Sequence, residues 1–440
     1  MAMELFTNQL IFLAAGLLLS TISLLYLRSN NQRKANMNNW FSNPFGSLRG
    51  RPSEDSKTPP RSTTPDKKTP TAPLVKDTLP PFVRDRLSKA AATSPGANVQ
   101  KLGGDPMSEA EVEKQLIPFE ANYWECSPST STPTGLTMEE VQALGDFPDY
   151  STLSGVPLPN PYTNFDITKA IPRPYRPFRW PYFQTMSLST LEPDWWLELE
   201  KTYVERIRER EELFEKYGKM VLNYLPGSEL GCKEIMETAL QFLCARYPQH
   251  FSLLNTGAEK DWVFKNGLLN NETIIKDMHP LHVLLHNVPE DFAVMLRNPD
   301  DGQYYFRAGL LCSSLGWNVD TKIGKKLSEI HQPIPDYKEK MSMSMDRYFS
   351  RQPTSKPIQR GSWGLEIDTP LFMPPNDPHE RFRLYQHTPL PLSRIHLRVD
   401  WQTLRRLPLS GAIIFNFKAL FTPIEKFREE RACRAWWRKC

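Results

Sequence analysis

The sequence has few of the features that mark several large protein classes. Its six cysteines form no C-x-x-C pair and four of them lie in apolar patterns, as free buried thiols do, which favours a reducing compartment over a disulfide framework. The net charge is only +4, from 54 basic and 50 acidic residues, so nucleic acid is not expected as a partner. The G-x-G-x-x-G, Walker, G-x-S-x-G and H-E-x-x-H motifs are absent, so the nucleotide, serine-hydrolase and zinc-protease sites that they mark are not expected.

Proline, in contrast, is abundant and unevenly distributed. Of the 40 prolines, 21 lie between residues 41 and 180, where Ser, Thr and Lys are also frequent. Such a segment buries too little apolar surface to offset chain entropy. We therefore expect a disordered tether over residues 28–170, with short helices at 108–116 and 137–144, followed by one globular domain over 171–427.

Residues 10–27, LIFLAAGLLLSTISLLYL, form an uncharged run of eighteen residues after a short tail at 1–9. As a helix this run spans roughly 27 Å, enough for a bilayer core. A cleaved signal peptide is disfavoured, since Glu4 is the only charged residue before the run and no cleavage site is evident. Basic residues follow the span at Arg28, Arg33 and Lys34. The prediction is a single-pass protein of the endoplasmic reticulum membrane with a cytosolic C-terminal domain.

Within the domain, periodicity predicts a mixture of helices and strands. Helical spacing of apolar residues is found in five segments, and strand-like runs in three. Because helices precede, separate and follow the strands, the fold class is α+β. The expected helices are 192–217, 232–247, 274–287, 321–331 and 338–349, and the expected strands are 292–297, 304–311 and 411–421.

Histidines supply two candidate ligand sites. His331 ends the predicted helix 321–331, before Gln332-Pro333, and a neutral imidazole in this position can be a haem axial ligand. From the residues alone, a helix-capping histidine is the favoured alternative. His279, His282 and His286 share one helix face, but without an accompanying ligand a solvated face is favoured over zinc.

Charged residues supply the other candidates. Glu290 and Asp291 are adjacent acids, which cap an element more often than they act as acid and base. A basic group surrounds Asp400, Trp401 and Gln402, which add polar groups to the same stretch. Such a group grips carboxylates or forms a basic surface. Its members are Arg394, Arg398, Arg405 and Arg406, and a basic tail with Trp436 and Trp437 at 428–440 is interpreted as an exposed helix.

Several blocks together resemble one family, the haem-dependent oxidative N-demethylase alpha-subunit-like proteins, whose fungal members are also called the HRQ family. The blocks occur in the family's order and cover roughly residues 173–424. They are YRPF at 175–178, TMSL at 185–188, DWW at 194–196, PEDFAVM at 289–295, LCSSLGWNVDTKIGKKLSEIHQPIPDY at 311–337, RGSW at 360–363 and LRVDWQTLRRLPLSGAIIF at 397–415.

The resemblance implies a PAS-like domain that holds haem b and removes N-methyl groups oxidatively from a small amine. Electrons would come from an external flavin or NADPH reductase partner. It makes His331 the axial-ligand candidate and Arg405 with Arg406 the propionate candidates. Asp400 and Gln402 would be catalytic, orienting the amine or relaying protons.

The sequence departs from the family pattern at one informative place. The usual Glu-Arg-Gln-Thr-Leu is here Asp400-Trp401-Gln402-Thr403-Leu404, so a five-donor guanidinium is replaced by a ring with one donor. A non-catalytic haem- or ligand-binding sensor therefore remains an alternative. A lumenal glycosyltransferase with a stem is a second alternative, although no D-x-D motif occurs and the flanking charges oppose it.

Overall fold

The computed structural model describes residues 127–129, 131–132, 134–176, 186–257, 262–298, 301–332, 334, 336–374, 377 and 390–430. The predicted membrane span at 10–27, the predicted helix at 108–116 and the tail beyond residue 430 lie outside these residues. In the part of the chain that the structure describes, no helix has the length and apolar character needed to cross a bilayer.

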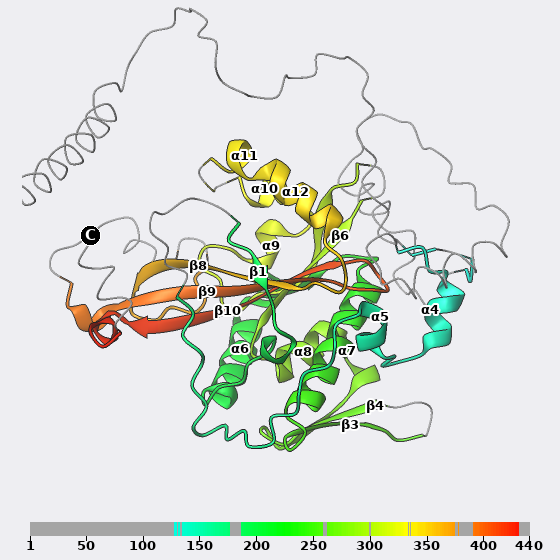
Figure 1. Ribbon diagram of the computed structural model, residues 1–440, viewed down its shortest axis with the longest axis horizontal. Helices are drawn as coiled ribbons and strands as arrows, with labels where there is room; N and C mark the ends of the chain where they lie inside the picture. The colour runs from blue at the N-terminus through cyan, green and yellow to red at the C-terminus, as the bar shows by residue number, and fades with distance from the viewer. Residues whose placement is uncertain are drawn as a thin grey trace, which may run out of the picture. The chain divides into compact units, whose positions relative to one another are not determined.

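The centre of the domain is a seven-stranded antiparallel sheet (Figure 1). Its longest pairing joins β9 and β10, from Arg406 opposite Ile413 to His396 opposite Pro423. In spatial order the strands are β1 (Ser189–Thr190), β8 (Ile358–Ile367), β9 (Ile395–Arg406), β10 (Ile413–Pro423), β6 (Asp291–Arg297), β7 (Tyr304–Leu310) and β2 (Leu222–Tyr224).

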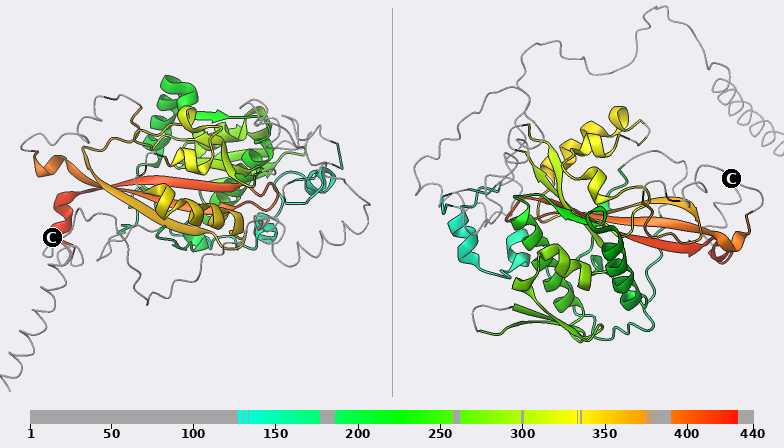
Figure 2. Two further views of the ribbon diagram at one scale, coloured as in Figure 1. Left: turned by 90° about the horizontal axis from the view of Figure 1, so that it is seen from above. Right: turned by 180° about the vertical axis from the view of Figure 1, so that it is seen from behind.

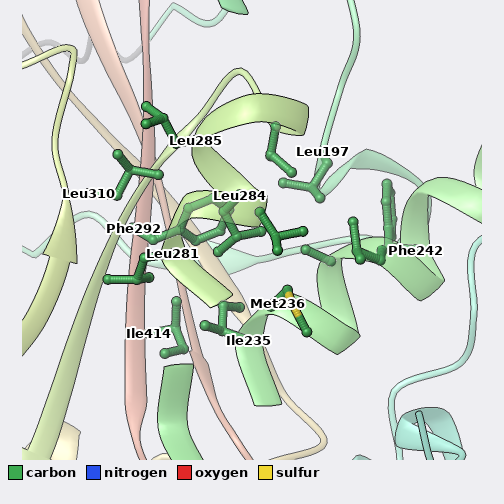
Figure 3. Close-up of a cluster of buried hydrophobic side chains, with 14 of the residues drawn as sticks. Leu197, Ile235, Met236, Phe242, Leu281, Leu284, Leu285, Phe292, Leu310 and Ile414 are labelled. Atoms are coloured by element: carbon green, nitrogen blue, oxygen red, sulfur yellow. The ribbon is translucent and has the colours of Figure 1, made fainter. Parts of the chain in front are cut away.

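Three helices cover one face of this sheet, namely α6 (Tyr203–Tyr217), α7 (Glu229–Arg246) and α8 (Pro280–Asn287). Figure 3 shows their apolar side chains meeting those of the strands, including Leu284 of α8, Phe292 of β6 and Ile414 of β10, all fully buried. Burying such side chains is the main stabilising term of the fold. This side of the sheet is called here the α6–α8 face.

Shorter helices cover the opposite face, which is called here the α9–α12 face. They are α9 (Val319–Lys322), α10 (Leu327–Ile330), α11 (Tyr337–Lys340) and α12 (Ser342–Arg351). A second apolar cluster lies beneath them, and it includes Leu327 and Ile330 of α10 and Leu404 of β9. Figures 1 and 2 both show α10–α12 across the sheet from α6–α8.

A second, three-stranded sheet packs on the helices away from the large sheet (Figure 2). It consists of β3 (Phe251–Asn255), β4 (Trp262–Asn266) and β5 (Asn271–Ile274). Its strands meet the helices through Phe251 and Phe264, both buried in the main core.

The packed domain begins earlier than residue 171. Helices α4 (Met138–Leu144) and α5 (Tyr150–Ser154) lie in the range assigned to the tether. Thr137 caps α4 in a capping box with Glu140, which confirms the predicted helix at 137–144. Apolar residues of both helices form a cluster with Leu230 and Leu409 of the main domain. That buried surface orders a segment whose proline content alone indicated disorder.

The α+β class is confirmed, and several predicted helices are shorter than expected. The helix predicted at 192–217 begins only at Tyr203, after a 3-10 turn at Pro193–Trp195. The helix predicted at 321–331 is split into α9 and α10 by Gly324, whose φ of 79° lies in the left-handed region. The helix predicted at 274–287 begins at Pro280, where a proline is tolerated.

Candidate functional site

His331 closes helix α10, as the sequence predicted. Its Nδ1 lies 2.8 Å from the carbonyl oxygen of Leu327, one turn earlier. Because a carbonyl oxygen only accepts, Nδ1 carries the proton and the lone pair of the neutral ring is on Nε2. Among the described residues, the Leu327 carbonyl oxygen is the hydrogen-bond partner found for the ring. The capping interpretation and the ligand interpretation are therefore compatible, since the capping bond orients the nitrogen that would bind a metal.

Two aromatic rings hold the imidazole of His331 in place. Tyr337 stacks on it with ring centroids 4.8 Å apart and planes at 9°, and Trp317 lies edge-on at 5.7 Å. This burial lowers the pKa of His331 below its ordinary value, with nearby Arg360 and Lys322 adding to the shift. The ring is consequently neutral at pH 7, the state in which histidine binds metal.

Two cations accompany His331 that the sequence analysis did not single out. Lys322 ends α9, and its Nζ lies 4.7 Å from the centroid of the Trp317 ring and 3.4 Å from the Ile330 carbonyl oxygen. Arg360 of β8 is paired with Gln402 of β9, so it projects toward the α9–α12 face. Both lie within sequence blocks that carried the family resemblance, which is the only signal that could have identified them.

Asp400 and Gln402 also lie on the α9–α12 face, because they alternate with Trp401 and share the side of Leu404. The carboxylate of Asp400 accepts a hydrogen bond of 2.8 Å from Nε of Arg398. The remaining Arg398 donors reach the carbonyl oxygens of Ser313 and Pro370. Gln402 donates to the Ser362 hydroxyl at 3.2 Å. The carboxylate of Asp400 is therefore held by a buried cation.

The structure does not bring Arg405 and Arg406 together, because neighbours in a strand point to opposite faces. Arg406 is 1% exposed and donates to the carbonyl oxygens of Gln352 and Gly411 at 2.7 and 3.0 Å. It also donates to the Tyr304 hydroxyl at 2.9 Å and to the Phe349 carbonyl oxygen. Its donors are thus committed within the fold.

Arg405 lies on the α6–α8 face, across the sheet from His331. Its guanidinium carbon is 3.3 Å from the centroid of the Trp196 ring. The basic group of the sequence is dispersed in the same way, since Arg394 pairs with Asp368 at 2.7 Å and Arg398 pairs with Asp400. The structure therefore does not bring several arginines together around one ligand in the way that the sequence predicted.

The family model for haem-dependent oxidative N-demethylase, alpha subunit-like proteins matches residues 187–438. This range is more than half of the 440 residues. The chain belongs to this family. The matched range contains all seven strands of the large sheet and every site residue described in this subsection.

The His331 cluster of this N-demethylase-like chain has the donor set that a haem group requires. An axial ligand needs an unprotonated nitrogen held by a hydrogen bond to its other nitrogen, which His331 provides. Propionates need cations, which Lys322 and Arg360 provide on the same face. Of the predicted residues, His331 fits this role and lies on the same face as Asp400 and Gln402, whereas Arg405 lies across the sheet.

The other histidines and acids that the sequence singled out form hydrogen bonds or ion pairs within the fold. His279 caps α8 by accepting a hydrogen bond from the Leu281 amide at 3.2 Å, and His286 binds Glu211 at 2.5 Å. Asp291 forms a buried ion pair of 2.5 Å with Arg210. Within the described ranges, no group of three His, Cys, Asp or Glu side chains is arranged to hold a metal ion.

Proposed function

We propose that this chain is a haem-dependent oxidoreductase of the oxidative N-demethylase type, with His331 as the axial ligand of haem b. The observation that carries the proposal is the neutral imidazole of His331, fixed by the Leu327 carbonyl oxygen and by Tyr337, with Nε2 left for iron. The family match supports the cofactor. The substrate would be a small amine, processed in the tailoring of a metabolite, and electrons would come from a separate flavin or NADPH reductase.

Bound haem would supply the oxygen-dependent chemistry that removes an N-methyl group. The chain's own residues would bind and orient. His331 would hold the iron, while Lys322 and Arg360 would offset the negative charge of the propionates. Asp400, on the same face, would attract an ammonium group, although its ion pair with Arg398 favours a positioning role over proton transfer.

This proposal is tested by the absorption spectrum of the full chain, produced in haem-replete cells. Wild type is expected to show a Soret band, and His331→Ala to lose most of it. Added imidazole should restore the band in His331→Gly, which excludes unfolding as the cause. His396→Ala is the matched control, since His396 lies in β9 and its ring contacts the Arg394 carbonyl oxygen at 3.2 Å. A haem-free wild type, or an unchanged band in His331→Ala, would refute the assignment.

A second candidate function is a non-catalytic haem-binding sensor with a PAS-like core. It is favoured by the occupied carboxylate of Asp400 and by Trp401, which replaces the family's arginine and is buried against Gln359. A sensor would bind haem but would not demethylate any amine when a reductase and NADPH are supplied. Formaldehyde release under those conditions separates the two functions.

We also propose that residues 10–27 anchor the chain in the endoplasmic reticulum membrane with the domain in the cytosol, which would place it beside membrane-bound reductases. The acceptor sequence Asn271-Glu272-Thr273 provides the test, because Asn271 is exposed in β5. A cytosolic domain leaves Asn271 without a glycan and open to added protease in intact microsomes. A glycan at Asn271 would place the domain in the lumen.

A further inference from the structure

Arg405 is a half-buried cation with no counter-ion among the residues that the structure describes. Its guanidinium stacks on Trp196, which is itself 1% exposed. The Nε atom is buried without a hydrogen-bond partner, and no ion pair or hydrogen bond to the side chain is found among the residues that the structure describes. The residue as a whole is only half-buried, so part of it is in contact with solvent.

The charge of Arg405 persists at physiological pH. Burial lowers the pKa of Arg405 to about 9, so the guanidinium remains protonated at pH 7. Removing an unpaired charge from water costs more than a single cation–π contact returns. Arg406, the next residue, avoids this cost through four hydrogen bonds. Arg405 has no such compensation in the described fold, and an anion from outside would provide it.

The ring of Trp196, on which Arg405 lies, is fixed by hydrogen bonds and packing. Nε1 of Trp196 donates to Oδ1 of Asn416 at 3.1 Å, and the Thr403 hydroxyl donates to the same oxygen at 2.8 Å. The amide of Asn416 in turn donates to Oε2 of Glu290 at 2.8 Å. Phe242 of α7 packs edge-on against the ring of Trp196 at 5.4 Å. A ring fixed on two sides holds the guanidinium in one orientation before any ligand binds, which lowers the entropic cost of binding.

We propose that Arg405, stacked on Trp196, binds the carboxylate of a small anionic molecule on the α6–α8 face of the sheet. With its carbon 3.3 Å from the ring centroid, the guanidinium has one face covered by Trp196, and its N–H groups lie in the guanidinium plane. A carboxylate presents two coplanar oxygens that match this fork, whereas a tetrahedral phosphate matches it less well. The site does not depend on the proposed haem function.

The sheet separates this carboxylate site from the His331 cluster. Arg405 shares its side of β9 with Thr403, which bonds to Asn416 above the α6–α8 core. His331 follows α10, whose Leu327 and Ile330 belong to the same apolar cluster as Leu404, on the opposite side of the sheet. A haem held by His331 would therefore not place its propionates on Arg405, and the carboxylate must come from another molecule.

The test is thermal unfolding of the full chain titrated with acetate and succinate, with phosphate and chloride as comparison anions at constant ionic strength. A ligand of the folded state raises the unfolding midpoint in a saturable way. Wild type is expected to show this rise with the carboxylates and not with chloride. Arg405→Met should weaken the carboxylate effect at least tenfold, and Arg405→Lys should weaken it several-fold, because lysine keeps the charge but lacks the planar fork. Arg394→Gln, which removes a half-exposed, ion-paired arginine just before β9, is the matched control.

Several outcomes would overturn the proposal. An equal midpoint rise in wild type and in Arg405→Met would show general screening, and a stronger response to phosphate would contradict the carboxylate assignment. Loss of the Soret band in Arg405→Met but not in Arg394→Gln would make Arg405 a propionate ligand and remove the separate site. If wild type binds carboxylate but never haem, the Arg405 site stands and the haem function fails. If Arg405→Met does not fold, Arg405→Lys gives the same comparison.

Discussion

Arg405 and Arg406 are neighbours in β9, yet the two faces of the sheet give them opposite surroundings. Arg406 joins the end of α12, strand β7 and the turn after β9 through donors to Phe349, Gln352, Tyr304 and Gly411. Arg405 contacts the ring of Trp196 and has no anion or carbonyl partner among the described residues. Neither pairs with a carboxylate of the described residues, so the difference lies in the hydrogen bonds.

This difference shows that a guanidinium can be buried in two physically distinct ways. Carbonyl oxygens that satisfy its donors make it part of the fold, and removing it leaves those oxygens unpaired. A guanidinium stacked on an aromatic ring, with its edge unsatisfied, is destabilising by itself and favours binding of an anion. We expect substitutions of the two residues to change stability in opposite directions.

The largest effect is expected for Arg406→Met. This change removes four hydrogen bonds and leaves the buried carbonyl oxygens of Phe349, Gln352 and Gly411 without that donor. The free energy of unfolding, measured by urea denaturation, should fall by about 3–5 kcal/mol. Arg405→Met, measured in the same way without added carboxylate, should be neutral or stabilising. Equal destabilisation by both variants would contradict the comparison.

A smaller effect is expected from Glu290, which precedes β6 beneath the α6–α8 face. It is fully buried, its Oε2 accepts from Asn416, and its Oε1 has no partner within the described residues. Burial raises the pKa of Glu290 from 4.5 to about 7. Between these two pKa values the folded chain keeps a proton on Glu290 that the unfolded chain has lost. The contribution of this group to stability is therefore complete below pH 4.5 and falls as the pH rises to 7.

Glu290→Gln should remove this part of the pH dependence. Between pH 4.5 and pH 8, the loss of unfolding free energy in the variant should be smaller than in wild type by on the order of 2–3 kcal/mol. Urea denaturation at several pH values measures it. Glu425→Gln replaces an exposed carboxyl and should leave the wild-type slope unchanged. Parallel curves for wild type and Glu290→Gln would mean that Glu290 is ionised in the folded chain.

Elements with a clear period were predictable from the sequence. Strands β6 and β7 agree with the prediction to within one residue, and α7 to within three, because their side chains face a core throughout. The failures have local causes. Gly324 adopts a conformation that ends α9, and the buried run of Trp196, Leu197 and Leu199 packs as an irregular segment before α6.

The site was predictable only in part. The capping position of His331 follows from local sequence, because Gln332-Pro333 stops the helix there. Residues 395–406 were interpreted as a basic group and not as a strand, so the opposite directions of Arg405 and Arg406 were missed. The approach of Arg360 to His331 depends on the pairing of β8 with β9, which joins residues about 40 positions apart. No local pattern encodes that register.

The smallest effect is expected for Trp196→Phe, which separates the two roles of the ring under Arg405. Phenylalanine keeps an aromatic face but loses the hydrogen bond to Asn416, whose oxygen still accepts from Thr403. The free energy of unfolding should fall by about 1 kcal/mol, and carboxylate should bind a few-fold more weakly because phenylalanine is the poorer cation–π partner. Trp401→Phe is the matched control, since it also removes one indole hydrogen bond, to Gln359 at 3.1 Å, away from Arg405. If both variants lose similar stability but only Trp196→Phe binds carboxylate more weakly, the ring of Trp196 holds Arg405 for its ligand. Equal carboxylate binding by the two variants would show that it does not.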